Sequence, residues 1–353
     1  MNKIKLLDTF AGIGGFHLGV KRACNELGID FECVGAIEFD KNARVTYAAN
    51  FPDVDMFDEW GGDITKIPLD NIPDHDVLTG GFPCQPFSRA GKAYQYNKQM
   101  LVADDDRANL FEFLIKILIV KQPEYCIFEN VKGILNLKNS NGELVSDLIV
   151  SCMENAGYNV TIQTISAHDV GTPQKRERVF FIGCRKPRQV KKVSLNVNCY
   201  TLSHILEHAV DTKYHIAHQK QWKQLGNIIK RPKYDLLLES FNSRKSKHVV
   251  STTKPVLAAE INNDTPCGRS RQRDRAYCVT GLSPTLNTTD KKVIYDGVNF
   301  RYLTEIECLR LQGFPDDFVY NNSTNLYRQI GNAVCVDVVY NIVKDLICAT
   351  SNN

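Results

Sequence analysis

The sequence lacks the paired ligands that a small metal-stabilised domain needs. None of its 12 cysteines is spaced Cys-x-x-Cys from another, so neither a zinc ribbon nor a thioredoxin-type pair is indicated. His204 and His208 lie one helical turn apart, but no cysteine or carboxylate completes a recognisable site with them. We therefore expect reduced thiols in an intracellular protein, and no bound metal.

Long apolar runs are also missing. The first eight residues contain too short an apolar run for a signal peptide. The most apolar helix candidate, residues 111–120, contains Glu112 and Lys116 and is too short to span a bilayer. We expect a soluble, cytoplasmic protein with no membrane segment.

The net charge is only +3, but it is unevenly distributed. Residues 185–300 hold 21 Lys and Arg against 9 Asp and Glu, an excess of +12, whereas the remainder holds 22 against 31, or −9. A basic segment in an acidic remainder favours a module that binds a polyanion. Within it, alternate positions in an extended segment would direct one set of arginines to phosphates or guanine edges, unless they form only a solvated loop. This set is Arg269, Arg271, Arg273 and Arg275.

The N-terminal segment has all but one glycine of a dinucleotide-binding loop. A predicted strand, residues 3–8, leads into Gly12-Ile13-Gly14-Gly15-Phe16-His17, with His17 where G-x-G-x-x-G has its last glycine. Glycines let the backbone turn tightly and approach a ligand closely. The strand, turn and following helix therefore still indicate a nucleotide-binding opening.

Polar and aromatic residues follow the next predicted strand, residues 31–37. Glu38 at its end is placed to accept hydrogen bonds from ribose hydroxyls, and Phe39 to stack on adenine. Gly62–Asp63 supplies a further polar loop.

A cysteine between two prolines, Cys84, directly follows the strand-like run 76–79 and Gly80–Gly81–Phe82–Pro83. Each proline fixes φ and removes an N–H donor, so the thiol is held on a stiff turn at a sheet edge, where ligands bind in open α/β folds. A structural cysteine more often lies inside an apolar run, as Cys126 does. We interpret Cys84 as a nucleophile.

Strands and helices alternate through the first 184 residues, which predicts a doubly wound, mostly parallel α/β sheet. The polar stretch 89–106 is too long for a simple connector and is interpreted as a lid. A strand at 125–128 delivers Glu129, a second acid–base candidate, to the same sheet edge. Further helices are predicted at 108–121, at 144–156 and from 327 to about 348, and further strands at 159–166 and 179–183.

Taken in order, these motifs resemble those of the cytosine-5 DNA methyltransferases over nearly the whole chain. Asp8–Gly15 resembles the family's cofactor loop, Gly80–Ser88 its Pro-Cys motif, and Glu129–Val131 its Glu-Asn-Val motif. Gln174–Arg178 resembles its segment of one glutamine and two arginines, Arg301–Pro315 the motif beyond the recognition region, and Gly331–Asn332 the closing motif. The basic segment falls where the family keeps its target recognition domain.

The resemblance implies a Rossmann-like methyltransferase that uses S-adenosyl-L-methionine, releases S-adenosyl-L-homocysteine and modifies C5 of a cytosine flipped out of duplex DNA. Cys84 would add to C6, Glu129 with a raised pKa would hydrogen-bond N3, and Arg178 would contact O2. Arg176 would support that contact or a phosphate. The implied cofactor pocket comprises Phe10, Gly12, Gly14, Glu38, Phe39, Asp63, Pro83 and Asn332; Ser88 joins the four arginines at the DNA.

Domains are expected at 1–184 (catalytic), 185–325 (target recognition, with a hinge) and 326–353 (returning to the catalytic domain). The setting implied is bacterial restriction–modification, with a monomeric enzyme and a cognate endonuclease as partner. One departure concerns the lid, where Asp105–Asp106–Arg107 precedes Ala108 and the family has glycine.

Three other functions compete with this interpretation. A tRNA cytosine-5 methyltransferase would share the scaffold and the Glu-Asn-Val segment. A nicotinamide oxidoreductase would share the opening but leave Cys84 without a task, and a non-catalytic DNA-binding protein would need neither Cys84 nor Glu129.

Overall fold

The structure is a computed structural model that describes residues 2–83, 110–186, 200–216, 257–260, 275–288, 291–296, 299–320 and 325–348. For 257–260 and Arg275 only the backbone is described. Several predicted features therefore lie outside the described residues: Cys84, Ser88, the segment 89–106, and the arginines Arg269, Arg271 and Arg273.

The largest sheet has six strands in the order β2-β1-β3-β4-β7-β5. β1 pairs in parallel with β2 and β3, and β3 pairs in parallel with β4. β7 runs antiparallel to both of its neighbours, β4 and β5. The predicted mostly parallel sheet is thereby confirmed. The strands are β1 Lys3–Thr9, β2 Asp30–Ile37, β3 Val77–Gly80, β4 Tyr125–Val131, β5 Asn159–Ser166 and β7 Glu177–Cys184.

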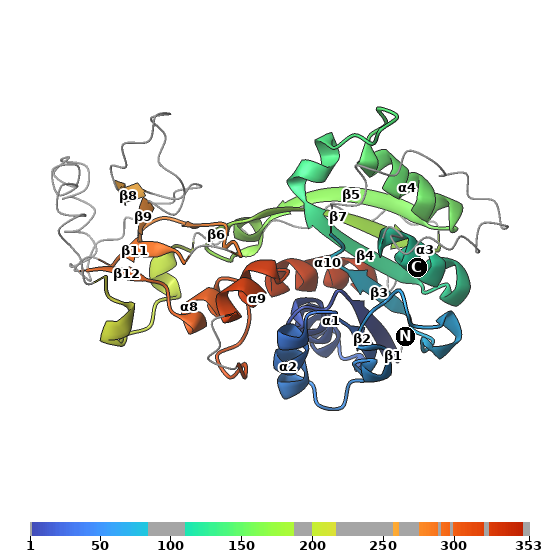
Figure 1. Cartoon of the computed structure of the whole chain (residues 1–353), viewed down its shortest axis with the longest axis horizontal. Coiled ribbons are helices and arrows are strands. Elements are labelled where there is room, and N and C mark those ends of the chain that lie inside the picture. The colour runs from blue at the N-terminus through green and yellow to red at the C-terminus, as the bar shows by residue number, and fades with distance from the viewer. Residues whose placement is uncertain are drawn as a thin grey trace.

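Alternate residues of the central strands face opposite layers of helices. In β4, Cys126 and Phe128 join the apolar cluster on one face, and Tyr125 and Ile127 join the cluster on the other. Helices α3 and α4 contribute to the first cluster, and α1 and α10 to the second (Figure 1). Burial on both faces explains why these strands read as unbroken apolar runs. The helices are α1 Gly15–Glu26, α2 Lys41–Asn50, α3 Leu110–Lys121, α4 Val145–Asn155 and α10 Val336–Cys348.

A smaller sheet lies at the end of the molecule away from β1 and β2 (Figure 1). Its order is β12-β11-β9-β8, and all four strands come from residues 257–302, within the predicted recognition region. Two short strands, β6 and β10, pair in parallel and tie the loop before β7 to this part of the chain. The strands are β6 Gln174–Lys175, β8 Leu257–Glu260, β9 Arg275–Cys278, β10 Ser283–Pro284, β11 Val293–Tyr295 and β12 Phe300–Tyr302.

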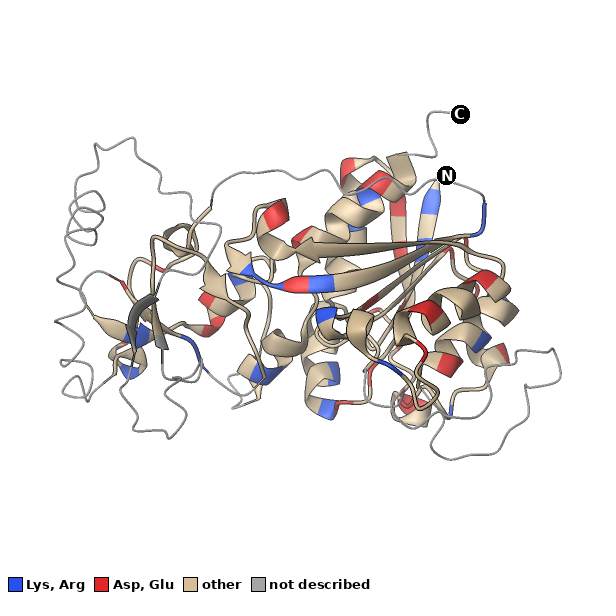
Figure 2. Cartoon of the chain, turned by 90° about the horizontal axis from the view of Figure 1, so that it is seen from above, with Lys and Arg blue, Asp and Glu red and all other residues tan. Residues whose placement is uncertain are grey.

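The charge contrast of the sequence falls mainly outside the described residues. Acidic and basic residues are interspersed over the helices and strands around the larger sheet (Figure 2). Most Lys and Arg of 185–300 belong to segments whose placement is not described. The basic segment therefore remains a prediction from composition.

The predicted C-terminal helix is wrong in one respect, because two helices form where one was expected. α9 (Leu326–Asn332) is followed by Ala333, whose ψ of 145° is extended, and α10 begins at Val336. The carbonyls of Gly331 and Ala333 accept hydrogen bonds from the Arg176 guanidinium at 3.0 and 2.8 Å. In a continuous helix those carbonyls would bind amides four residues on, so Arg176 takes the place of helical hydrogen bonds at the break.

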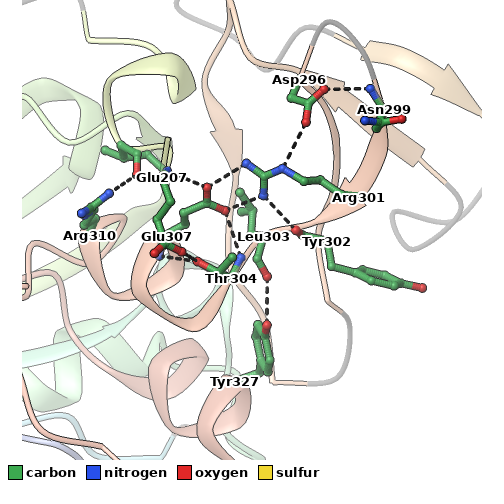
Figure 3. A network of polar contacts seen from close by, with 11 residues as sticks. Glu207, Asp296, Asn299, Arg301, Tyr302, Leu303, Thr304, Glu307, Arg310 and Tyr327 are labelled. Atoms are coloured by element: carbon green, nitrogen blue, oxygen red, sulfur yellow. Dashed lines mark hydrogen bonds and ion pairs between the residues drawn. The ribbon is translucent and has the colours of Figure 1, made fainter. Parts of the chain in front are cut away.

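A buried ion pair joins the smaller sheet to α8 (Glu305–Arg310), as Figure 3 shows. Both terminal nitrogens of Arg301, in β12, donate to the Glu307 carboxylate at 2.8 Å. The same carboxylate accepts the backbone amides of Thr304 and Glu207, and Arg301 Nε contacts Asp296 at 3.3 Å. We call the pair Arg301–Glu307 the buried ion pair.

Candidate active site

The backbone that leads to Cys84 is fixed where β3 and β4 end side by side. The Asn130 side-chain amide donates to the Phe82 carbonyl at 3.0 Å, and the Phe82 ring packs against Phe111 and Phe128. A Cβ on Gly81 would lie 3.5 Å from Oε2 of Glu129. The chain two residues before the predicted nucleophile is therefore anchored beside the predicted acid.

Glu129 and Arg178 meet because β4 and β7 are antiparallel neighbours. Arg178 pairs with Val131 in the ladder, and its Nε lies 2.9 Å from Oε1 of Glu129. The two side chains are 17% and 14% exposed, so the pair is shielded but still reachable from outside. Burial raises the pKa of Glu129, and the charges of Arg178 and Arg176 oppose that rise. A raised pKa agrees with the acid–base role expected of Glu129.

The position of Arg176 agrees with one of its two expected roles, support of Arg178, and not with the other, a phosphate contact. Its guanidinium is buried and donates to the backbone carbonyls of Leu286, Gly331 and Ala333 at 2.8–3.0 Å. Burial, reinforced by the charge of Arg178, lowers the pKa of Arg176 to about 9. This geometry does not favour the phosphate contact and instead makes Arg176 a support beneath Arg178 and the closing motif.

The glycine loop after β1 adopts a backbone that few other residues tolerate. Gly12 and Gly14 have φ of 54° and 93°, and Phe10 has φ of 52°. A Cβ on Gly14 would lie 2.4 Å from the Phe51 ring. The Gly12 amide donates to Oε2 of Glu38 at 2.8 Å, so the carboxylate after β2 holds the loop in place.

The other residues predicted to bind the cofactor differ in their exposure and in the contacts that they already make. Phe39 is 71% exposed, an unusual state for a large ring and one that leaves a face free for stacking. Asp63 Oδ1 accepts from the amide and hydroxyl of Thr65, and Lys66 pairs with its other oxygen. Pro83 and Asn332 are exposed. Glu38 already accepts two amides, from Gly12 and Asp40, which leaves it only its remaining lone pairs for a ribose.

The sequence motifs contained two positioning side chains whose contacts could not be deduced. Asn130 follows Glu129, the candidate acid. Its side-chain amide holds the Phe82 carbonyl in the elbow, which is the segment Gly80–Pro83 that leads to Cys84. Gln174 donates to the Leu311 carbonyl at 2.6 Å and accepts the Leu286 amide at 2.9 Å, which ties three distant segments together. Each lies inside a recognised motif, and that was the only available signal.

Within the described part of the chain, no His, Cys, Asp and Glu side chains cluster in a way that could hold a metal ion. In the same residues, no helix combines the length and apolar character needed to cross a membrane. Arg275 opens β9, and its three companion arginines lie outside the described residues.

Comparison with known proteins places this geometry in a family. The type II methyltransferase M.NlaX of Neisseria lactamica is 32% identical, over 98% of this chain and 97% of its own length. M.HhaI of Haemophilus parahaemolyticus is 29% identical, over 97% and 95%. The solved structure of a mutant DNMT2 from Spodoptera frugiperda superimposes with a TM-score of 0.65 over 98% of this chain and 99% of that one; at 21% identity it shows the fold alone.

The family model for C-5 cytosine-specific DNA methylases matches residues 4–348. The match runs from β1 to the last residue of α10 and includes every motif described above. The chain belongs to the C-5 cytosine-specific DNA methylase family, whose members transfer a methyl group to C5 of cytosine in DNA.

Proposed function

We propose that this chain methylates C5 of a flipped-out cytosine in a specific duplex sequence, through a covalent bond between Cys84 and C6. The proposal rests on one observation: the segment that leads to Cys84 lies directly beside Glu129. Gly81 lies against Oε2 of Glu129, while Asn130 holds the Phe82 carbonyl. A base bound between them would have its C6 toward the cysteine and its N3 toward the carboxyl group.

Cytosine C5 is not nucleophilic enough to take a methyl group from a sulfonium unaided. The Cys84 thiolate forms an S–C6 bond, and the C5–C6 π electrons move so that C5 becomes nucleophilic and negative charge develops toward N3 and O2. C5 then forms its bond to the methyl carbon as the bond between that carbon and the donor's sulfur breaks, and the electron pair stays on the sulfur, which leaves as a neutral thioether. Loss of the C5 proton and β-elimination break the S–C6 bond and restore both the thiolate and the aromatic ring.

Glu129 and Arg178 divide the stabilisation of the developing charge. A carboxyl group with a raised pKa can hold a proton at N3, which a fully ionised one cannot. Arg178 orients Glu129 through the 2.9 Å contact, with donors left for O2. Arg176 acts from behind by fixing the backbone around the closing motif.

S-adenosyl-L-methionine, the methyl donor of this family, supplies an electrophilic methyl group on a sulfonium. The residues after β1 and β2 fit such a group: a glycine loop with positive φ, a carboxylate at Glu38 and an exposed ring at Phe39. Asp63, Pro83 and Asn332 complete the proposed pocket. The role of this chain is to bind and orient the donor; no metal is proposed.

We assign target recognition to the segment between residues 1–184 and residues 326–353. We place the catalytic domain at 1–184, the recognition domain and hinge at 185–325, and the returning segment at 326–353. The smaller sheet supports this division, since all four of its strands lie at 257–302, within the proposed recognition domain. The four alternate arginines and Ser88 are proposed to contact DNA.

The biological setting proposed is a bacterial restriction–modification system. The relatives above are named type II methyltransferases, and they match over nearly their full length. A cognate endonuclease acting on the same site, a monomeric state and a place beside the DNA in the cytoplasm complete the proposal.

The test is methylation itself, measured by bisulfite sequencing of DNA from cells that express the chain. We expect one methylated cytosine within one short recurring sequence. Cys84→Ser should abolish methyl transfer while cofactor binding is retained, because a hydroxyl is a far poorer nucleophile at neutral pH. Tritium transfer to tRNA but not to duplex DNA would replace this function by the tRNA alternative, and a Cys84→Ser rate near that of wild type would refute the mechanism.

A further inference from the structure

A buried carboxyl group outside the proposed catalytic set connects the cofactor loop to the elbow. Asp8 is fully buried at the end of β1 and pairs with Thr79 of β3 in the parallel ladder. Thr79 Oγ1 lies 2.8 Å from Asp8 Oδ1. Within a few residues, Asp8 leads to the glycine loop and Thr79 leads to Cys84.

A second contact binds the same two strand ends. Thr9 Oγ1 donates to the Thr79 carbonyl at 2.6 Å, also out of solvent. A Cβ on Gly80 would lie 2.7 Å from Thr9 Oγ1, so only glycine permits this approach. The relative position of the two functional loops therefore depends on side-chain hydrogen bonds centred on Thr79.

The surroundings of Asp8 disfavour a negative charge. Its second oxygen, Oδ2, is buried and has no hydrogen-bond partner among the described residues. The titratable groups that face it are Cys33 of β2, Tyr47 of α2 and Glu38 after β2, and the backbone amide of His17, whose ring contacts Tyr47, donates to the carboxyl group. None of them supplies a cation, since burial lowers the pKa of His17 to about 3. Burial raises the pKa of Asp8 itself to about 8.

We propose that Asp8 is a positioning residue for methyl transfer: as the neutral carboxylic acid it holds the cofactor loop and the Cys84 elbow in register through Thr79. The inference rests on the proposed function of Cys84. Asp8 touches no reacting atom. Ionisation would place an unpaired charge beneath both loops and disturb the distance between methyl donor and nucleophile.

The sign of the pH effect follows from the raised pKa. From about pH 4 to about pH 8 the unfolded chain ionises Asp8 and the folded chain does not, so folded stability falls over that window. Above about pH 8 the folded protein ionises as well, and the register between the loops is lost. The wild-type rate should therefore fall on the alkaline side.

The experiment is the single-turnover methylation rate from pH 6 to 9.5 at saturating S-adenosyl-L-methionine and DNA. Any loss caused by deprotonation of Glu129 is common to both proteins, so wild type should lose more rate above about pH 8 than Asp8→Asn, which is neutral at every pH. At pH 7, Asp8→Asn should stay within a few-fold of wild type. Thr79→Val should lower the rate about 10-fold without changing the Kd for DNA, and Thr79→Ser should recover most of it. Thr164→Val, an exposed position in β5, is the matched control and should change nothing.

An Asp8→Asn profile with the same alkaline loss would overturn the inference, and so would a Thr79→Val rate equal to wild type. If Asp8→Asn does not fold, as judged by thermal unfolding, the two Thr79 variants decide. Failure of the proposed function is distinguishable, since wild type itself would then transfer no methyl group to DNA.

Discussion

Two glutamates in this molecule are paired with arginines and shielded from water, yet their surroundings differ sharply. Glu307, in the buried ion pair, is 0% exposed, and both of its oxygens are occupied, by two arginine nitrogens and two backbone amides. Glu129, at the end of β4, is 14% exposed and meets one arginine nitrogen through Oε1, while Oε2 lies toward the elbow.

The difference agrees with a structural role for Glu307 and with the proposed catalytic role of Glu129. A carboxylate with every acceptor site used is held in one position. A carboxyl group with one oxygen left open, in surroundings that raise its pKa, can take up a proton and pass it to a base. Exposure and the number of donors, more than the arginine partner, distinguish the two.

The largest expected effect comes from replacing Glu129 by a side chain that has no acidic proton. Glu129→Gln should lower the single-turnover rate by about 10²–10⁴-fold, because an amide cannot supply the N3 proton. Base flipping, followed by fluorescence of 2-aminopurine in the target, should persist. Glu177→Gln, an exposed neighbour in β7, is the control. A loss of less than a few-fold would remove Glu129 from the acid role.

A substitution in the Arg301–Glu307 pair should lower the free energy of unfolding and should not act on the chemical step. Arg301→Met leaves Glu307 buried without its partner, which should cost about 3–5 kcal/mol in the free energy of unfolding. Urea unfolding measures this change. Lys132→Met removes an exposed pair with Glu177 and should cost at most about 1 kcal/mol. Equal losses in the two variants would show that burial does not set the difference.

The smallest effects are expected in the basic segment. An arginine that contacts only phosphate should weaken binding to all sequences alike and reduce the salt slope by roughly one. One that reads a guanine should lose about 1–3 kcal/mol of discrimination at a single base pair. Single substitutions at Arg269, Arg271, Arg273 and Arg275 separate the cases in binding titrations. Uniformly unchanged binding and specificity would move recognition elsewhere, with the segment 89–106 as the next region to test.

The sequence predicted the central sheet well because its signals are local. Unbroken apolar runs, a glycine turn and strand ends marked by Glu38 and Glu129 all reside in a few adjacent residues. The strand bounds at β1, β2 and β5 agree with the predicted ranges to within one residue. Family resemblance supplied the roles that such patterns alone left open.

Contacts between distant segments were beyond the reach of such patterns. The break between α9 and α10 depends on Arg176, more than 150 residues earlier, and nothing in residues 326–348 announces it. The same holds for Asn130 at the elbow and for Asp8 with Thr79. In each case the residue type was visible, but its partner was fixed only by the packing of the sheet.

Covalent capture of the target base tests the central claim most directly. Duplex DNA with 5-fluorocytosine at the methylated position should form a stable adduct with wild type in the presence of S-adenosyl-L-methionine, because fluorine at C5 prevents the final elimination. Peptide mass spectrometry should locate the modified base on Cys84, and Cys84→Ser should form no adduct. An adduct on another residue, or none from a wild-type enzyme that methylates the normal duplex, would contradict the account.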